Sequence, residues 1–256
     1  MRLTSFLNPS LTDDSWRGLV ENIDKIRSGL TPNALLQGGR NDVYKIEHEG
    51  KQLVLKCFYN RGAWKKVAYK LSTSKARRSY LHSQKLINIG INSPSPIFWR
   101  EDWDGAWLQN SYYVSEFLDY AHDGRSFNDS SIEDKTFKIR LAAETIACMH
   151  EAEIEHLDLN PANFLFKQGI DRKWQIYIID NNRMKVGPVS LKRGITPLLL
   201  MELKGEDLDL LIASYSKVRN VDTADCRNLY FNTLNRHNLK WRIKSKTRPW
   251  RRKIGL

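Results

Sequence analysis

The amino-acid sequence predicts an α+β fold with two lobes, in which an N-terminal lobe built on an antiparallel sheet precedes a mostly helical C-terminal lobe. Strand-like runs separated by glycine turns fill the first half of the chain, whereas helical spacing of apolar residues dominates the second. The 256 residues suit two small lobes, and 41% hydrophobic with 27% charged residues excludes wholesale disorder. A cluster of Asp, Asn and Gly near 118–128 marks the predicted boundary; the predicted parts are 1–118, 119–235 and a basic tail, 236–256.

The N-terminal lobe is predicted to contain two helices and two hairpins. Amphipathic spacing predicts a helix over 14–28, and a second helix over 72–89 ends at Gly90 with prolines just beyond it. Two pairs of strand-like runs each flank a turn signal, Glu49-Gly50 or Asp104-Gly105, and predict antiparallel hairpins. The paired runs are 43–46 with 53–58, and 96–99 with 107–117.

The C-terminal lobe is predicted to begin with a long helix. Ser130-Ser131-Ile132-Glu133 resembles a capping box, and the apolar residues after it predict a helix that runs to about residue 152. A loop over 156–163 and two short strands follow, before a mostly helical remainder from residue 197. The strands are 164–166 and 177–179, the second ending at Asp180.

Charge is unevenly distributed along the chain. The 41 Lys and Arg outnumber the 29 Asp and Glu, and the formal charge of +12 predicts an anionic partner. Two blocks hold no acid: residues 51–100 carry eleven basic residues and residues 236–256 carry nine. Three scattered cysteines indicate neither a disulfide framework nor a metal site, and we expect neither a signal peptide nor a membrane span. These observations predict a basic intracellular protein.

The stretch His156–Asn163 carries the strongest chemical signal. Asp158 and Asn163 are five positions apart on one loop and can face one small site, and Asp180 follows an apolar strand seventeen residues later. Mg²⁺ prefers a few protein oxygens and completes its shell with phosphate and water. Asn163 and Asp180 are therefore candidate Mg²⁺ ligands. Asp158 and Asn163 taken alone are also ordinary turn residues.

Two features upstream suit phosphate groups. Lys56 interrupts an apolar strand, where a lysine can be held as a fixed charge for a phosphate. Gly38, Gly39 and Arg40 precede a strand, and glycines there let backbone N–H groups approach phosphates closely. Taken singly, Lys56 also fits a snorkelling edge-strand lysine, and the glycine pair a plain hairpin turn.

The order of these parts, which is glycine turn, strand lysine, His-x-Asp-x-x-x-x-Asn loop and strand-end Asp, is that of protein-kinase-like phosphotransferases. With Leu159-Asn160 in the loop and the segment 74–97, residues 35–185 resemble the lipopolysaccharide kinase family, which includes the 3-deoxy-D-manno-octulosonic acid (Kdo) and core-heptose kinases. The resemblance implies a protein-kinase-like fold and ATP and Mg²⁺ as cofactors.

The resemblance also implies a role for each candidate residue. Asp158 would accept the proton of the acceptor hydroxyl, and Lys56 would hold the α- and β-phosphates of ATP. Asn163 and Asp180 would hold Mg²⁺. The remaining residues would contact ATP, with the glycine turn over the phosphates and the hinge beside adenine; they are Gly38, Gly39, Arg40, Glu116 and Phe117.

Three departures from the kinase pattern stand out. No acid occurs from Gly50 to Arg100, so the helix after Lys56 lacks the usual glutamate partner, and Tyr80-Leu81 stand where we expect an acid. Lys56 could pair with Asp180 instead, and a pseudokinase without turnover is the alternative. Asn181-Asn182 replace the usual Phe-Gly, and Leu157 replaces the arginine that reads a phosphorylation switch. These two changes favour a small-molecule or sugar kinase.

We therefore expect ATP- and Mg²⁺-dependent phosphorylation of a sugar hydroxyl in the inner core or Kdo region of lipopolysaccharide. The acceptor would be a lipid-linked sugar. The basic tail with Trp241 and Trp250 predicts docking to an anionic membrane, so we expect a cytoplasmic protein on the inner face of the inner membrane. A kinase for protein or another small molecule remains an alternative. A nucleic-acid partner is not expected, because the basic blocks lack a known module. The sequence indicates no oligomeric state.

Overall fold

The chain folds as two compact units. The computed structural model describes residues 2–11, 13–59, 73–129 and 131–253, with side chains described through residue 239. The first unit joins residues 1–121 to 167–184, and the second joins 122–166 to 185–256. The segment that carries Asp180 therefore belongs with the N-terminal unit, whereas the loop that carries Asp158 belongs with the helical one. The division at residue 118 remains a prediction.

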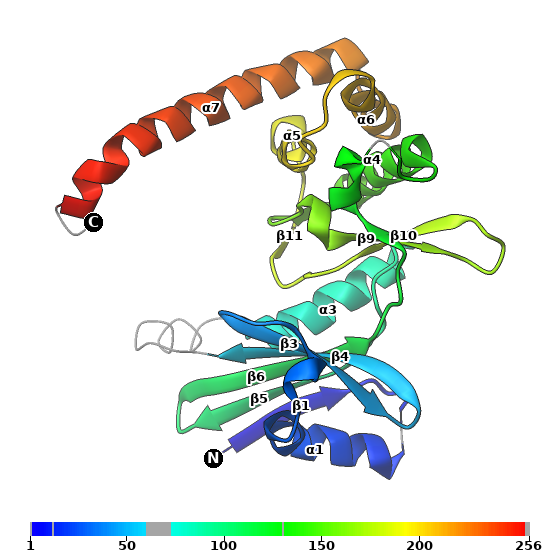
Figure 1. Cartoon of the computed structure of the whole chain (residues 1–256), viewed down its shortest axis with the longest axis vertical. Coiled ribbons are helices and arrows are strands. Elements are labelled where there is room, and N and C mark those ends of the chain that lie inside the picture. The colour runs from blue at the N-terminus through cyan, green and yellow to red at the C-terminus, as the bar shows by residue number, and fades with distance from the viewer. Residues whose placement is uncertain (1, 12, 60–72, 130, 254–256) are drawn as a thin grey trace. The chain divides into compact units, whose positions relative to one another are not determined.

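A six-stranded antiparallel sheet forms the frame of the first unit. The strand order is β1-β5-β6-β4-β3-β2, and both predicted hairpins lie within it (Figure 1). The edge strands β1 and β2 were not predicted. The strands are β1 (Arg2–Leu7), β2 (Leu35–Gln37), β3 (Asn41–His48), β4 (Lys51–Tyr59), β5 (Pro96–Asp104) and β6 (Trp107–Glu116).

Turn chemistry explains why the first hairpin closes where it does. Glu49 and Gly50 adopt φ of 50° and 68°, so both central residues are left-handed, as a tight turn between twisted strands requires. The pairing of β3 with β4 then runs without a shift from His48 opposite Lys51 to Asn41 opposite Phe58. This register places Val43 directly opposite Lys56.

Helices cover the two faces of this sheet. Helix α1 (Asp14–Ser28) has the predicted bounds, and its Trp16 and Ile23 pack with Leu55 and Tyr112 on one face. Helix α3 (Lys75–Asn88), capped by Ser74, packs on the other face (Figure 1). There Tyr80 contacts strand residues such as Phe58 and Tyr113, which directly follow residues that face α1. Burying apolar surface stabilises both layers by roughly 25 cal/mol per Å².

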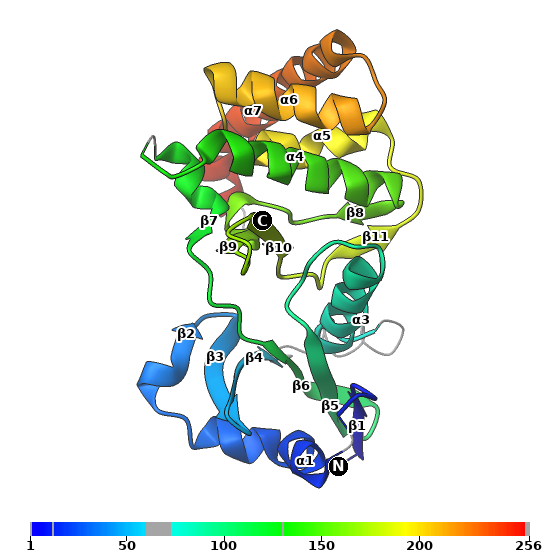
Figure 2. The ribbon, with the colours of Figure 1, turned by 90° about the vertical axis from the view of Figure 1, so that its right-hand side faces the viewer.

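The second unit is mainly helical. Helix α4 packs against α5 and α6, and these two helices also contact α7 (Figure 2). The chain enters through β7 (His122–Asp123), which pairs with the start of β9 (Phe164–Gln168). The helices are α4 (Lys135–Glu151), α5 (Leu191–Leu200), α6 (Gly205–Val218) and α7 (Thr223–Lys253). Within the described residues, none of the helices combines the length and the apolar character needed to cross a bilayer.

The start of α4 corrects the sequence interpretation. The helix does not begin at the predicted signal Ser130–Glu133, of which Ser130 lies outside the described residues. Asp129 Oδ1 instead accepts hydrogen bonds from Ser131 N and Oγ at 2.9 and 2.7 Å in a local turn. The helix begins at Lys135, after Asp134 in the left-handed region. Helix α5 likewise begins at Leu191, earlier than the helical stretch predicted from residue 197.

Candidate active site

Lys56 and Asp180 form an ion pair inside the first unit. Along β4, Leu53, Leu55 and Cys57 enter the core beneath α1, so the alternation turns Lys56 to the other face. Lys56 Nζ lies 3.6 Å from Asp180 Oδ1, and the two side chains are 16% and 39% exposed. The suggestion that Asp180 replaces the missing helix acid as the partner of Lys56 is therefore confirmed.

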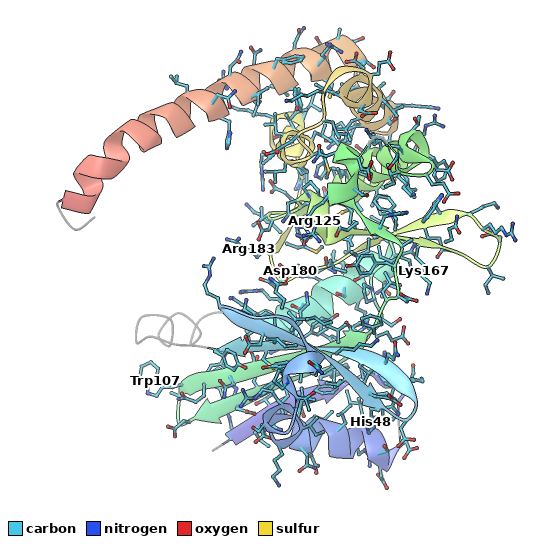
Figure 3. All side chains as sticks on the ribbon, viewed as in Figure 1. His48, Trp107, Arg125, Lys167, Asp180 and Arg183 are labelled. Carbon is cyan, nitrogen blue, oxygen red and sulfur yellow. The ribbon has the colours of Figure 1, made fainter. Side chains whose placement is uncertain are left out.

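Asp180 is held by its backbone conformation and by a neighbouring amide. It follows β10 (Trp174–Ile178) by two residues and adopts φ of 60°, a left-handed conformation that Asp tolerates better than most residues (Figure 3). Asn182 Nδ2 donates to Asp180 Oδ1 at 2.8 Å, and the carbonyl of Asn182 accepts from Arg78 Nε on α3 at 3.1 Å. One carboxylate oxygen thus faces both Asn182 and Lys56.

The residue after Asp180 is anchored in the core of the unit. Asn181 is 3% exposed, and its Nδ2 lies 3.0 Å from both Ser83 Oγ and Ser93 Oγ. Its carbonyl lies 2.6 Å from His82 Nδ1, which must be the protonated nitrogen because a carbonyl only accepts. Burial lowers the pKa of His82, which favours this neutral ring. Neutral hydrogen bonds thus occupy the place where a kinase usually packs phenylalanine.

Helix α3 presents small neutral groups toward this segment. Ser83 contacts Asn181, and Ser79 lies four residues earlier on the same face, buried with an Oγ that has no hydrogen-bond partner within the described part of the chain. Tyr80 points instead into the cluster formed with Phe58 and Trp99. The helix therefore contributes shape and hydrogen bonds to the site, and no acidic side chain to pair with Lys56.

The glycine turn lies between β2 and β3. Gly38, Gly39 and Arg40 are all exposed, and Gly39 adopts φ of 146°, a conformation that other residues avoid. Its N–H points to Asp42 Oδ1 at an N···O distance of 3.3 Å. The donors that remain for a phosphate are therefore the backbone of Gly38 and Arg40 and the Arg40 guanidinium.

The two hinge candidates stand at the end of β6. Glu116 is exposed and pairs with Leu53, and Phe117 N donates to Gln52 O at 3.0 Å. Lys45 Nζ lies 4.2 Å from the ring centroid of Phe117, a cation–π contact. These bonds continue the β4–β6 ladder and fix where the strand-to-linker turn begins.

The loop that carries Asp158 lies in the second unit and is held through its backbone. The carbonyl of Asp158 accepts from Asn163 Nδ2 at 2.7 Å and from Asn160 N at 3.0 Å. Asp158 N donates to His156 Nδ1 at 3.2 Å, so that nitrogen is unprotonated and the buried His156 supports the loop, as the sequence indicates. These bonds join Asp158 to Asn163 and turn the amide oxygen of Asn163 away from Asp158.

A glycine that sequence reasoning did not assign to the site supports this loop. Gly124 opens the short 3-10 helix η2 (Gly124–Asn128), and a Cβ added there would lie 2.5 Å from Pro161 O. Pro161 begins the turn η3 (Pro161–Asn163) that carries Asn163. Only the Asp123-Gly124 pair, taken as a boundary marker, hinted at this close approach.

Asn163 in the second unit and Asp180 in the first each carry an oxygen of the kind that a hard cation accepts. A carboxylate and an amide oxygen are ligands that Mg²⁺ accepts, with phosphate and water completing its shell. In the described part of the chain, three or more His, Cys, Asp or Glu side chains nowhere gather as a metal site would need.

Comparisons with known proteins identify the family. The model of the lipopolysaccharide kinase (Kdo/WaaP) family matches residues 37–187, more than half of the chain. The chain belongs to this family. The matched range includes the glycine turn, Lys56, the Asp158 loop and Asp180, and the chain is accordingly a kinase. Helix α1 lies outside the matched range.

A solved structure of a family relative supports the fold. The structure described as "WaaP in complex with acyl carrier protein" is similar to this kinase with a TM-score of 0.62 at 16% identity, covering 92% of this chain and 99% of that chain. The α+β, kinase-like fold predicted from the sequence is therefore confirmed. A comparison with curated protein sequences finds no match.

Proposed function

We propose that this kinase transfers the γ-phosphate of ATP, in the presence of Mg²⁺, to a sugar hydroxyl in the inner core or Kdo region of lipopolysaccharide. The observation that carries the proposal is the Lys56–Asp180 pair, whose side chains lie 3.6 Å apart. In kinases a lysine contacts the nucleotide phosphates, and a nearby aspartate binds the Mg²⁺ that accompanies them. The family match to lipopolysaccharide kinases supports the acceptor class.

The first unit would bind the nucleotide. Lys56 would contact the α- and β-phosphates, and the exposed Gly38 and Arg40 would approach the phosphates from the glycine turn. Glu116 and Phe117 would lie beside adenine at the end of β6. Asp180, with Asn163 from the second unit, would hold Mg²⁺, which when bound neutralises phosphate charge.

The second unit would act on the acceptor. The Asp158 carboxylate would accept the hydroxyl proton as the sugar oxygen bonds to the γ-phosphorus and the bond to the β-phosphate bridging oxygen breaks, which releases ADP. The hydrogen bonds at Asp158 fix its backbone, so the carboxylate is presented without rearrangement of the loop. The proposal requires both units to act on one nucleotide.

The alternative of an inactive pseudokinase rests on the absence of an acidic helix partner for Lys56. Asp180 supplies that partner in this chain, and the family is one of kinases. No observation specifically favours a protein acceptor. Asn181 stands where a protein kinase has its switch phenylalanine, and it is bound to Ser83 and Ser93 instead.

The transfer itself is the first test of the proposal. Purified protein is incubated with labelled ATP, Mg²⁺ and a lipid-linked Kdo acceptor, and the position of the phosphate is mapped. We expect label on a sugar hydroxyl, dependent on both acceptor and Mg²⁺. If ATP is bound but no hydroxyl acceptor in a panel of sugars, peptides and small molecules is labelled, the protein binds nucleotide without turnover and the proposal is wrong.

The site of action would be an anionic membrane face. Residues 236–256 carry nine basic residues, no acid and two tryptophans. Basic residues near anionic lipid contribute roughly 1 kcal/mol each, so this tail would dock the kinase where a lipid-linked acceptor resides, on the cytoplasmic side of the inner membrane. Deleting 236–256 should abolish co-sedimentation with phosphatidylglycerol-containing vesicles while leaving ATP affinity unchanged. Unaltered vesicle binding would refute this docking role.

A further inference from the structure

A chain of hydrogen bonds links helix α1 to the glycine turn. Arg27 Nη1, in the last turn of α1, donates to Tyr59 Oη at 3.1 Å, and Tyr59 Oη donates to Asp42 Oδ2 at 2.9 Å. The other oxygen of that carboxylate, Oδ1, accepts from Gly39 N at 3.3 Å. The four residues come from α1, the end of β4, the start of β3 and the turn itself.

In this series of hydrogen bonds, each donor meets an acceptor. A tyrosine hydroxyl has one proton to give and can accept another, so it can accept from Arg27 while donating to Asp42. Burial, followed by its neighbours Cys57 and Asp42, raises the pKa of Tyr59, and the hydroxyl therefore stays protonated. Arg27 and Asp42 are both charged, and charge-assisted hydrogen bonds are stronger than neutral ones.

These hydrogen bonds lie on the α1 face of the sheet, one residue pair away from Lys56. Asp42 stands opposite Cys57 in the β3–β4 ladder, and the next pair along is Val43 opposite Lys56. Arg27 also stacks over the Tyr59 ring, with Cζ 5.8 Å from the centroid. A displacement of α1 would therefore move Tyr59 and Asp42, and with them the glycine turn and the strand residues next to Lys56.

We infer that Arg27, Tyr59 and Asp42 are positioning residues that fix the glycine turn for nucleotide phosphates, an inference that rests on the proposed ATP-binding role of the turn. Asp42 holds the Gly39 amide away from the phosphates and so selects Gly38 and Arg40 as the donors. Arg27 offsets the negative charge that Asp42 would otherwise place beneath a polyphosphate. Helix α1, which the family model does not cover, thereby becomes part of the nucleotide site.

The test replaces Tyr59 with phenylalanine in the full-length protein and measures Kd for ATP–Mg²⁺, kcat, melting temperature and amide exchange at Gly39. Loss of one hydrogen bond of this kind should weaken ATP affinity about five-fold and speed Gly39 exchange by a similar factor, with kcat at saturating ATP unchanged. Arg27→Gln should weaken ATP affinity more than Tyr59→Phe, because it also removes the positive charge that offsets Asp42.

The matched control is Tyr44→Phe. Tyr44 Oη approaches the same Asp42 oxygen at the longer distance of 3.4 Å, so its removal should change ATP affinity less than two-fold. A lower melting temperature with unchanged ATP affinity in Tyr59→Phe would mean a purely structural role and would overturn the inference, as would unchanged Gly39 exchange. The proposed function fails separately if wild type does not transfer phosphate, since ATP affinity and Gly39 exchange are measured without turnover.

Discussion

The segment around Asp180 and the loop around Asp158 are held by different kinds of contact. Asn181 and Asn182 are bound by α3 side chains that lie 98 to 104 positions earlier in the chain. The hydrogen bonds described above at the backbone of Asp158 join residues no more than five positions apart. The difference shows that one part of the candidate site depends on the packing of the first unit, whereas the other is built largely by its own sequence.

The largest expected effect concerns the local loop. Asp158→Asn keeps the shape of the side chain and every backbone hydrogen bond described at Asp158, so the loop should stay folded. Removing the proton acceptor should lower kcat about 10²- to 10⁴-fold. Single-turnover transfer of labelled phosphate measures the rate, and circular dichroism checks the fold. Near wild-type turnover in this variant would remove Asp158 from the mechanism.

Gly124→Ala tests the main contact made to this loop from a distant residue. The added methyl group would meet Pro161 O at 2.5 Å, so the loop must move. We expect a loss of about 1–3 kcal/mol in stability and a fall in kcat, because η3 carries Asn163. Gly18→Ala is the control, since nothing lies within 4 Å of its added methyl and helix propensity improves. Equal kcat and stability in both variants would show that the loop tolerates displacement.

Asn182→Ala tests the side chain that orients the Asp180 carboxylate. It removes the 2.8 Å hydrogen bond to Asp180 Oδ1 and should raise the Mg²⁺ concentration needed for half-maximal activity about 10-fold, as loss of outer partners does at metal sites. Asn160→Ala removes the bonds of the Asn160 side chain to Ala162 N and Asp158 O in the other region, and should lower kcat without changing the Mg²⁺ requirement. An equal shift of the Mg²⁺ requirement in both variants would contradict the assignment of the metal to Asp180.

The smallest effect is on pH stability and concerns the scaffold beneath the loop. Burial, with Arg219 and Arg193 nearby, lowers the pKa of His150 on α4 to about 3, so the ring is neutral and faces Tyr215 Oη at 2.9 Å. The unfolded chain binds the additional proton below pH 6.5, so stability is retained above that pH and falls as pH drops toward 3. Between pH 7 and 5 the loss should be about 2 kcal/mol.

Urea unfolding at pH 7 and pH 5 measures this loss. His150→Gln keeps a hydrogen-bonding group near Tyr215 but does not titrate, so its stability should change less between the two pH values than that of wild type. An identical pH dependence in the two proteins would show that His150 is not the titrating group.

The local elements of the fold could be predicted from sequence because they depend on neighbours in the chain. Spacing of apolar residues gave the bounds of α1, and the Glu49-Gly50 and Asp104-Gly105 turns gave both hairpins. The predicted start of α4 was too early: the helix begins at Lys135, and Ser131 bonds to Asp129 in a turn before it. Nearby side-chain acceptors compete with a helix start for the same donors, and the sequence alone does not decide between them.

The candidate site was predictable only where chemistry follows a motif. Residue types and order pointed to Lys56, Asp158, Asn163 and Asp180, but no pattern indicated that Gly124 supports the loop or that Asn182 and Arg78 hold Asp180. The contacts of Gly124 and Arg78 join distant positions, so they depend on the tertiary fold, whereas Asn182 lies only two residues from Asp180. The sequence left open whether Lys56 has an acidic partner, and the ion pair with Asp180 answers this question.

The most direct test of the account compares ATP–Mg²⁺ affinity in Lys56→Met and Asp158→Ala by calorimetry. Because Lys56 would bind nucleotide phosphates and Asp158 would accept a proton, the first variant should lose affinity about 10-fold or more, while the second should bind within about two-fold of wild type. Wild-type affinity in Lys56→Met, or an equal loss in Asp158→Ala, would contradict this division of roles.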